Sequence, residues 1–210
     1  LASYPVKGVI WYQGESNARN KEIHEILFPL LVDSWRKNWN KEFPFYYVQL
    51  SGLNRPSWPH FRDSQRRLEK IIPGSGMAVS SDLGDSLDVH PKRKQEVGER
   101  LARLALNKTY GKDIVPSGPQ YKESEFKNGY ALISFEYANG LRASDDKVLR
   151  SFEIAEFDGL YFPAKAIVEG DKIKVWNDKV KHPRFVRYGW APYTNGNLVN
   201  RELLPASTFT

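Results

Sequence analysis

Val6-Lys-Gly-Val-Ile-Trp-Tyr12 is an apolar run of β-branched and aromatic residues that ends at the polar residues 13–17. This composition and its sharp polar boundary predict a buried strand. Apolar residues then recur at three- and four-residue spacing from Ile23 to Trp39, which predicts an amphipathic helix. Because Pro29 lies inside this run, we expect two helical pieces or a kink there.

The alternation of strand and helix continues along the chain. Two further strands are predicted at 45–50 and 77–81, and two further helices at 60–72 and 92–106. This alternation favours parallel β-α-β units with right-handed crossovers. Ligands of such sheets bind beyond the carboxyl ends of the strands. We therefore expect three loops to converge on one edge of the sheet, at residues 13–17, 51–59 and 82–90.

After residue 111 the chain consists of short strand-like runs separated by turn pairs. Asp158-Gly159, between alternating runs at 151–157 and 160–168, predicts a β-hairpin. Further strand-like runs lie at 130–137, 172–176 and 184–188. We therefore predict two domains, an α/β portion over residues 1–114 and a β-rich domain over 115–210. The second is formed by an antiparallel β unit, either a small sandwich by itself or a β layer packed on the first part.

The bulk composition excludes several classes of protein. The 210 residues are 40% hydrophobic and 27% charged, which is typical of globular chains with one large or two small domains. The net charge is +6, but Glu99 lies among Arg93, Arg100 and Arg103, so we expect a solvated helix face and no nucleic-acid partner. No apolar run approaches the ~20 residues of a membrane span, and no membrane partner is expected. The absence of cysteine excludes disulfides and thiolate sites.

Asp88-Val-His-Pro91 leads directly into the predicted helix at 92–106. A carboxylate two residues before an imidazole can orient that ring and stabilise its protonated form, so His90 is a candidate general base with Asp88 as its acid. The proline at the first helical position fixes the backbone where the loop ends. A histidine of this kind requires a nucleophile.

Gly14-Glu-Ser-Asn-Ala18 lies between a strand and a helix and approximates the G-x-S-x-G nucleophile elbow. The chain order Ser16, aspartate, His90 also matches an α/β-hydrolase triad. Two features argue against this interpretation: Asp88 and His90 share one loop, and an alanine replaces the last glycine. A loop or capping role is the alternative for Ser16.

A metal site is not expected. His24, His60 and His182 are scattered along the chain, with no second ligand at metal-binding spacing. Asp82 and Asp85 lie in a glycine-containing loop and could bind a cation, but loop acids more often accept hydrogen bonds from backbone amides.

Trp11-Tyr-Gln-Gly-Glu-Ser-Asn17 and Asp82-Leu-Gly-Asp85, running into residues 88–91, resemble the SGNH (GDSL-like) hydrolase superfamily and, within it, the sialate O-acetylesterase family. The likeness extends to Val186-Arg-Tyr-Gly-Trp190 and to Asn197-Leu-Val-Asn200. The resemblance implies a partial three-layer α/β/α fold with a parallel sheet, followed by the C-terminal antiparallel β unit. It also implies a serine-dependent carbohydrate O-acetylesterase that needs no cofactor, with an O-acetylated sugar or sialoglycan as its partner.

The resemblance also implies roles for particular residues. Gln13, beside Gly14, would donate to the oxyanion of the tetrahedral intermediate, an interaction typically worth roughly 3–4 kcal/mol. Glu15 and Asn17 would hold that donor in place. His90 would be the general base.

The position of the acid departs from the superfamily pattern. The superfamily usually places this aspartate three residues before the histidine, where this chain has Leu87. Asp88 is therefore our choice, with Asp85 in reserve. Around the site, Trp58 could stack on a sugar ring and Arg62 could face the pocket, although a surface position is equally compatible with the latter.

In this family the nucleophile belongs to an N-terminal block that follows the first strand of the sheet. Nothing before Val6 supplies that strand or that serine. We therefore expect the C-terminal part of such an esterase, inactive alone and partnered by the N-terminal remainder of the same protein. A periplasmic or secreted location is implied only by the family.

Two rival functions remain open on the sequence. In a non-catalytic carbohydrate-binding module, the β-rich half would provide the sugar platform. A nucleic-acid binder would show steeply salt-dependent affinity, which we do not expect.

Overall fold

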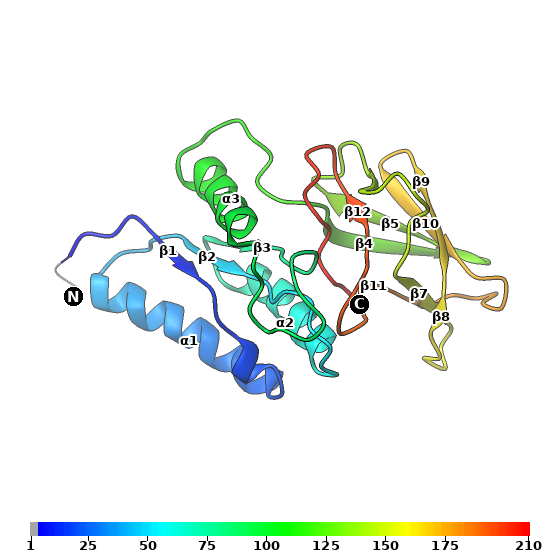
Figure 1. Cartoon of the computed structure of the whole chain (residues 1–210), viewed down its shortest axis with the longest axis horizontal. Helices are drawn as coiled ribbons and strands as arrows, with labels where there is room; N and C mark the ends of the chain where they lie inside the picture. The colour runs from blue at the N-terminus through cyan, green and yellow to red at the C-terminus, as the bar shows by residue number, and fades with distance from the viewer. Residues whose placement is uncertain (1–3) are drawn as a thin grey trace.

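A computed structural model, which describes residues 4–210, has a parallel α/β portion followed by antiparallel β-sheets (Figure 1). The parallel sheet has the order β1-β2-β3, with β1 at Val9–Trp11, β2 at Phe45–Val48 and β3 at Ser75–Ala78. Both strand pairs are parallel, and Phe45 of the central strand is in register with Val9 and with Ser75. The parallel sheet predicted from the alternation is confirmed, but its strands are shorter than expected. β3 begins two residues before the predicted start, and β1 is not the fully buried strand that was expected.

Helices cover both faces of this sheet. α1 (Lys21–Trp39) and α2 (Trp58–Ile71) lie on one face, and α3 (Lys94–Leu104) lies on the other (Figure 1). Alternation along β2 explains this, because Phe45 and Tyr47 are buried in the core with α1 and α2, whereas Tyr46 and Val48 are buried with α3. A single π-helical turn, η2 (Ala105–Thr109), extends α3.

The interruption expected at Pro29 does not divide the helix. α1 is one element of 19 residues with Pro29 inside it. Phe28 and Val32 on either side of the proline are buried against the sheet, at 4% and 0% exposure. The burial of this face offsets the backbone hydrogen bond that proline cannot donate.

The buried histidine of α1 makes stability depend on pH. His24 is 5% exposed and stacks on Phe28 at 5.2 Å, with Phe61 at 4.6 Å. Desolvation lowers the pKa of His24 to about 4. Between pH 6.5 and pH 4 the unfolded chain therefore binds a proton that the folded chain does not. The free energy of unfolding should fall by about 2–3 kcal/mol as the pH drops through this window.

Urea unfolding of the wild type and of His24→Phe at about pH 7 and about pH 4.5 tests this prediction. The variant should lose less stability on acidification, by about 2–3 kcal/mol. Burial raises the pKa of Glu69, so protonation of Glu69 changes the stability in the sense opposite to His24 as the pH falls. Both proteins contain Glu69, so its contribution cancels when their pH dependences are compared. Identical pH dependence in the two proteins would show that His24 is not the responsible group.

The C-terminal half contains three antiparallel sheets. Their strand orders are β4-β5-β10-β9, β11-β7-β8 and β12-β6. The strands of the first sheet are β4 (Gln120–Lys127), β5 (Tyr130–Glu136), β9 (Lys165–Glu169) and β10 (Lys172–Trp176). The others are β6 (Arg142–Ala143), β7 (Phe152–Ala155), β8 (Phe162–Pro163), β11 (Phe185–Tyr188) and β12 (Leu198–Val199).

The predicted hairpin around Asp158-Gly159 is confirmed. β7 and β8 pair antiparallel through Glu153 with Pro163 and Ile154 with Phe162, and Gly159 has a φ of 72°. The sequence does not predict the first strand of this half, β4. None of its side chains is fully buried, so its sequence has no apolar run that would indicate a strand: Gln-Tyr-Lys-Glu-Ser-Glu-Phe-Lys.

The buried clusters fall into two groups along the chain. The largest lies wholly within 131–209, whereas the three others lie within 18–104. The proposed boundary near residue 115 lies between these two groups.

Arg62 connects the α/β portion to the β-rich half. Arg62 of α2 is fully buried, and its guanidinium donates to Thr208 Oγ1 at 2.9 Å and to the carbonyl oxygens of three residues, Gly189 (2.9 Å), Ala191 (2.6 Å) and Pro192 (2.8 Å). Burial lowers the pKa of Arg62 to about 9. Four oxygen acceptors compensate this buried cation, so its role here is structural.

Arg62→Met should reduce the free energy of unfolding by about 3 kcal/mol or more, because each buried acceptor left without a donor costs about 1–3 kcal/mol. Urea denaturation measures the loss, with Arg184→Met as the matched control, since Arg184 is exposed on the β-rich half. A loss no larger than that of the control would contradict the role assigned to Arg62.

Candidate active site

The loop after β1 is held against the start of α2 by a glycine. Gly14 has a φ of 150°, and a Cβ there would lie 2.7 Å from the ring of Phe61. Only glycine fits this conformation and this space. The loop then forms a short 3-10 helix, η1 (Glu15–Asn17), in which Asn17 N–H donates to the Gly14 carbonyl at 2.9 Å.

The loops after β2 and β3 meet through a pair of glycines. A Cβ on Gly84 would lie 2.2 Å from the carbonyl oxygen of Gly52, so the two backbones are in direct contact. Asn54 N–H also donates to the Ser86 carbonyl at 3.1 Å. Val89 packs on the buried cluster that contains Trp58 and Ala18, and Ala18 follows η1 directly. The predicted convergence of the three loops is thus confirmed.

His90 and Asp88 form an exposed pair on the third loop. The distance from His90 Nδ1 to Asp88 Oδ1 is 3.4 Å, and the two side chains are 87% and 44% exposed. The backbone N–H of His90 donates to Asp88 Oδ1 at 2.9 Å, and this hydrogen bond is the main cause that lowers the pKa of Asp88. A carboxylate that stays ionised beside an imidazole can orient the ring and stabilise its cation. Hydrogen bonds of this kind are often long before substrate binds.

Asp85, the alternative candidate for the acid, binds backbone groups of its own loop. Asp85 Oδ1 accepts from the backbone N–H groups of Leu87 at 2.8 Å and Asp88 at 3.3 Å. Asp85 therefore shapes the turn that presents Asp88 and His90. Between the two candidate acids, this geometry favours Asp88.

The loop residues expected to support catalysis lie close together in sequence but are not bonded to one another. Gln13, Glu15 and Asn17 are all half-buried. Within residues 4–210, no hydrogen bond joins the side chain of Gln13 to that of Glu15 or Asn17, and none joins His90 to Ser16. The expected support of Gln13 by its neighbours is therefore not seen in this conformation.

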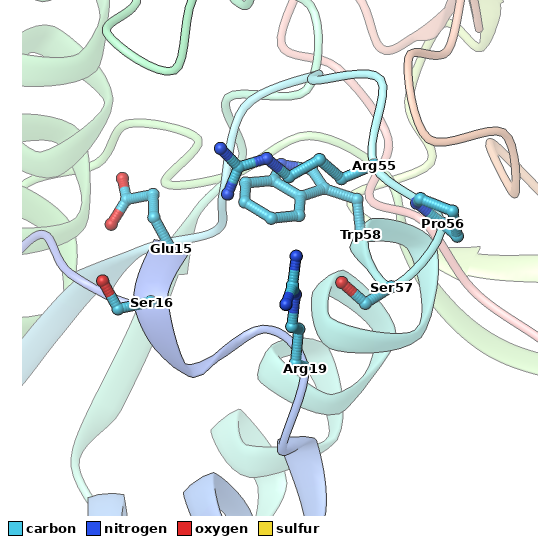
Figure 2. A pocket seen from close by; sticks show the side chains of 7 residues that line it. All are labelled: Glu15, Ser16, Arg19, Arg55, Pro56, Ser57 and Trp58. Carbon is cyan, nitrogen blue, oxygen red and sulfur yellow. The ribbon is translucent and has the colours of Figure 1, made fainter.

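A cleft of about 690 Å³ opens beside these loops. Figure 2 shows its lining, which comes from the first and second loops: Glu15, Ser16, Arg19, Arg55, Pro56, Ser57 and Trp58. The Trp58 indole is only 2% exposed, its Nε1 donates to the Ser51 carbonyl at 2.9 Å, and the Arg55 guanidinium covers it at 5.4 Å. A sugar could stack on Trp58 only if Arg55 moved.

The structure changes which arginines belong to the pocket. Arg62 is a pocket candidate on the sequence, but its guanidinium lies inside the protein on the four acceptors described above. The cleft instead presents Arg19 and Arg55, which the sequence motifs do not single out. The one clue to these residues is their place in or beside two post-strand loops that are expected to converge.

The acidic residues of the third loop bind other groups of the same chain. Arg100 binds both carboxylate oxygens of Asp82 at 2.6 Å, which occupies this candidate ligand. Among residues 4–210, no group of three or more potential metal-binding side chains gathers. In the same part of the chain, no helix combines the length and apolar character needed to cross a membrane.

The fold and the converging loops match a known class of enzyme. A solved structure of a carbohydrate acetylesterase from Xanthomonas citri superposes on 99% of this chain with a TM-score of 0.94 and 35% sequence identity. The class is therefore that of carbohydrate esterases. More narrowly, the chain belongs to the sialic acid-specific acetylesterase family, whose family-wide sequence model matches residues 1–107.

Curated relatives agree with this family. Sialate O-acetylesterase of Mus musculus is 32% identical, with the match covering 74% of this chain and 33% of the mouse protein. The Homo sapiens enzyme is 30% identical, with 74% and 34% covered. The chain thus spans about a third of the length of these relatives, and 51% of the Xanthomonas citri chain.

Proposed function

We propose that the full-length protein is a serine-dependent O-acetylesterase of SGNH type that removes acetyl groups from sugars, sialic acid among them. The observation that carries this proposal is the convergence of the Gln13 loop with the loop of Asp88 and His90 at one edge of a parallel sheet. Membership of a carbohydrate esterase family supports acetylated sugars as the substrate class.

In the proposed mechanism, a serine hydroxyl attacks the acetyl carbonyl while His90 Nε2 accepts its proton. The side-chain amide of Gln13 donates a hydrogen bond to the oxyanion that forms. When the intermediate collapses, the ester bond breaks and His90 returns the proton to the departing sugar oxygen. Water activated by His90 then hydrolyses the acetyl-enzyme and releases acetate. Asp88 stabilises the imidazolium at both stages.

We further propose that the nucleophile lies outside residues 1–210, in a preceding segment that adds a strand beside β1. Among the described residues β1 pairs only with β2, so its other edge has unpaired backbone groups. On the face covered by α3, the side chain of Ile10 in this strand is 69% exposed.

An exposed apolar stripe on α1 supports the same proposal. Ile23, Ile26, Leu27 and Leu30 recur at helical spacing and are each 55–64% exposed. They lie on the side of α1 opposite its buried residues His24, Phe28 and Val32, and so face away from the sheet. An exposed apolar stripe of this kind matches a surface that a further segment of the protein would cover.

Ser16 remains the second candidate nucleophile because it is exposed and lines the cleft. The absence of a hydrogen bond to His90 within residues 4–210 disfavours it. In this alternative the 210-residue chain would be an esterase by itself.

Hydrolysis assays separate these possibilities. The full-length protein should release acetate from O-acetylated sialic acid, and the 210-residue chain should not hydrolyse p-nitrophenyl acetate above background. Hydrolysis by the chain alone that is abolished by Ser16→Ala would instead establish Ser16 as the nucleophile. Glycan binding by residues 112–210 without any esterase activity in the full-length protein would favour the carbohydrate-binding module.

Two further expectations stand as proposals. The N-terminal remainder of the same protein and an O-acetylated sugar or sialoglycan are the proposed partners. A periplasmic or secreted location fits an enzyme that acts on glycans.

A further inference from the structure

The cleft beside the catalytic loops has a positive charge balance. Its charged lining residues are two arginines, Arg19 and Arg55, and one acid, Glu15 (Figure 2). Within residues 4–210, neither arginine side chain takes part in an ion pair or donates a hydrogen bond. The arginines of neighbouring α2 differ, because Arg66 and Arg67 both bind the carboxylate of Asp63.

Arg55 is held in place without using its donors. Its guanidinium stacks over the Trp58 indole at 5.4 Å, and the indole is fixed by its hydrogen bond to Ser51. The backbone around it is a tight turn, in which Arg55 N–H donates to Leu53 at 2.8 Å and Trp58 N–H donates to Arg55 at 3.0 Å. This cation–π contact holds the guanidinium without using its N–H groups, which can therefore bind a carboxylate in a bidentate manner.

Arg19 approaches the same space from the first loop. Its side chain extends toward the Trp58 indole, across the cleft from Arg55 (Figure 2). Ala18, which is buried under the Trp58 cluster, anchors the backbone directly before it. Val89, the residue before His90, packs on the same cluster, so the His90 loop and the arginine-bearing loops share this support.

We propose that Arg19 and Arg55 bind the carboxylate of an acidic O-acetylated sugar and so select anionic over neutral substrates; this inference rests on the proposed esterase function. Two guanidinium groups across one cleft match the charge and the planar geometry of a carboxylate. Glu15, the single acid in the lining, reduces the charge without cancelling it, and it repels a carboxylate placed next to η1. The acidic group of the sugar therefore lies toward Trp58.

Binding to the 210-residue chain tests the proposal without catalysis. The probes are N-acetylneuraminic acid and its methyl ester, which differ only in the charge of the carboxyl group, titrated against the protein and followed by NMR. The acid should bind at least about tenfold more tightly than the ester. Arg19→Gln and Arg55→Gln should each weaken binding of the acid by about tenfold and leave binding of the ester unchanged. Arg184→Gln is the matched control, an exposed arginine outside the cleft, and should change neither affinity.

The proposal would be overturned if the wild-type chain bound N-acetylneuraminic acid and its methyl ester equally well, or bound neither. It would also be overturned if neither cleft substitution changed the affinity for N-acetylneuraminic acid. Loss of binding to both sugars would also overturn it, because that result indicates a structural role for the arginines. The proposed esterase function is judged separately, by acetate release from a neutral O-acetylated sugar by the full-length protein. If that activity persists while the acid is not preferred, the inference fails and the esterase function stands.

Discussion

His90→Ala should lower kcat for the proposed acetyl ester hydrolysis by the full-length protein by about 10³-fold or more. The imidazole is exposed, lies 3.4 Å from an ionised carboxylate, and is carried by a loop fixed to its neighbours at Gly84 and Val89. Nothing in the folded core depends on this ring, so the free energy of unfolding should be unchanged. Steady-state kinetics with an O-acetylated sugar, together with urea unfolding of the same samples, measures both quantities.

His182→Ala is the matched control, because His182 is exposed in the β-rich half. Asp88→Asn and Asp85→Asn complete the test of this loop. The first should reduce kcat because the amide cannot stabilise the imidazolium, whereas the second should act mainly through the turn that Asp85 shapes. Full activity in His90→Ala, or a loss in His182→Ala of the same size, would rule out His90 as the base.

Gln13→Ala should lower kcat by about 10²–10³-fold with a smaller effect on KM, because an oxyanion donor acts mainly in the transition state. Gly14 positions this residue, since no side chain fits between its Cα and the Phe61 ring. Gln95→Ala provides a matched control, as this exposed glutamine lies on α3 and bonds only Glu99. An unchanged kcat, or a rise in KM alone, would contradict the oxyanion role and assign Gln13 to substrate binding.

Much of the α/β portion could be predicted because two of its strands, β2 and β3, are buried on both faces. Phe45–Val48 is fully buried, which gives a continuous apolar run that stands out in the sequence. The convergence of the three loops follows from the parallel order of their strands. The weak alternation of β4 explains why this strand could not be predicted, since its half-exposed faces carry charged residues such as Glu123 and Glu125.

The surroundings of the site were harder to predict because they depend on contacts between distant segments. The acceptors of Arg62 lie 127–146 residues away, so no local pattern distinguishes this buried cation from a pocket residue. The stacking of Arg55 on Trp58 likewise depends on a turn that the sequence does not mark. By contrast, Asp88 and His90 form their pair within one loop, and their local spacing was enough to predict it.

The apolar stripe on α1 and the open edge of β1 connect the fold to the proposed mechanism. The open edge of β1 lies where a further strand of the same sheet would pair, the stripe is an apolar surface that a further segment would cover, and the chain spans about a third of the length of its curated relatives. In the proposed enzyme, base, acid and oxyanion donor come from residues 13–90, and the nucleophile comes from the segment that covers this surface.

The most direct test of this division is to map where a fluorophosphonate, which reacts with activated serine hydroxyls, becomes covalently attached. Labelling the full-length protein, followed by mass spectrometry of its peptides, should place the adduct on a serine outside residues 1–210. The same labelling should be strongly reduced in His90→Ala, and the 210-residue chain should remain unlabelled. An adduct on Ser16, or labelling that is indifferent to His90, would contradict the proposed split of the active site.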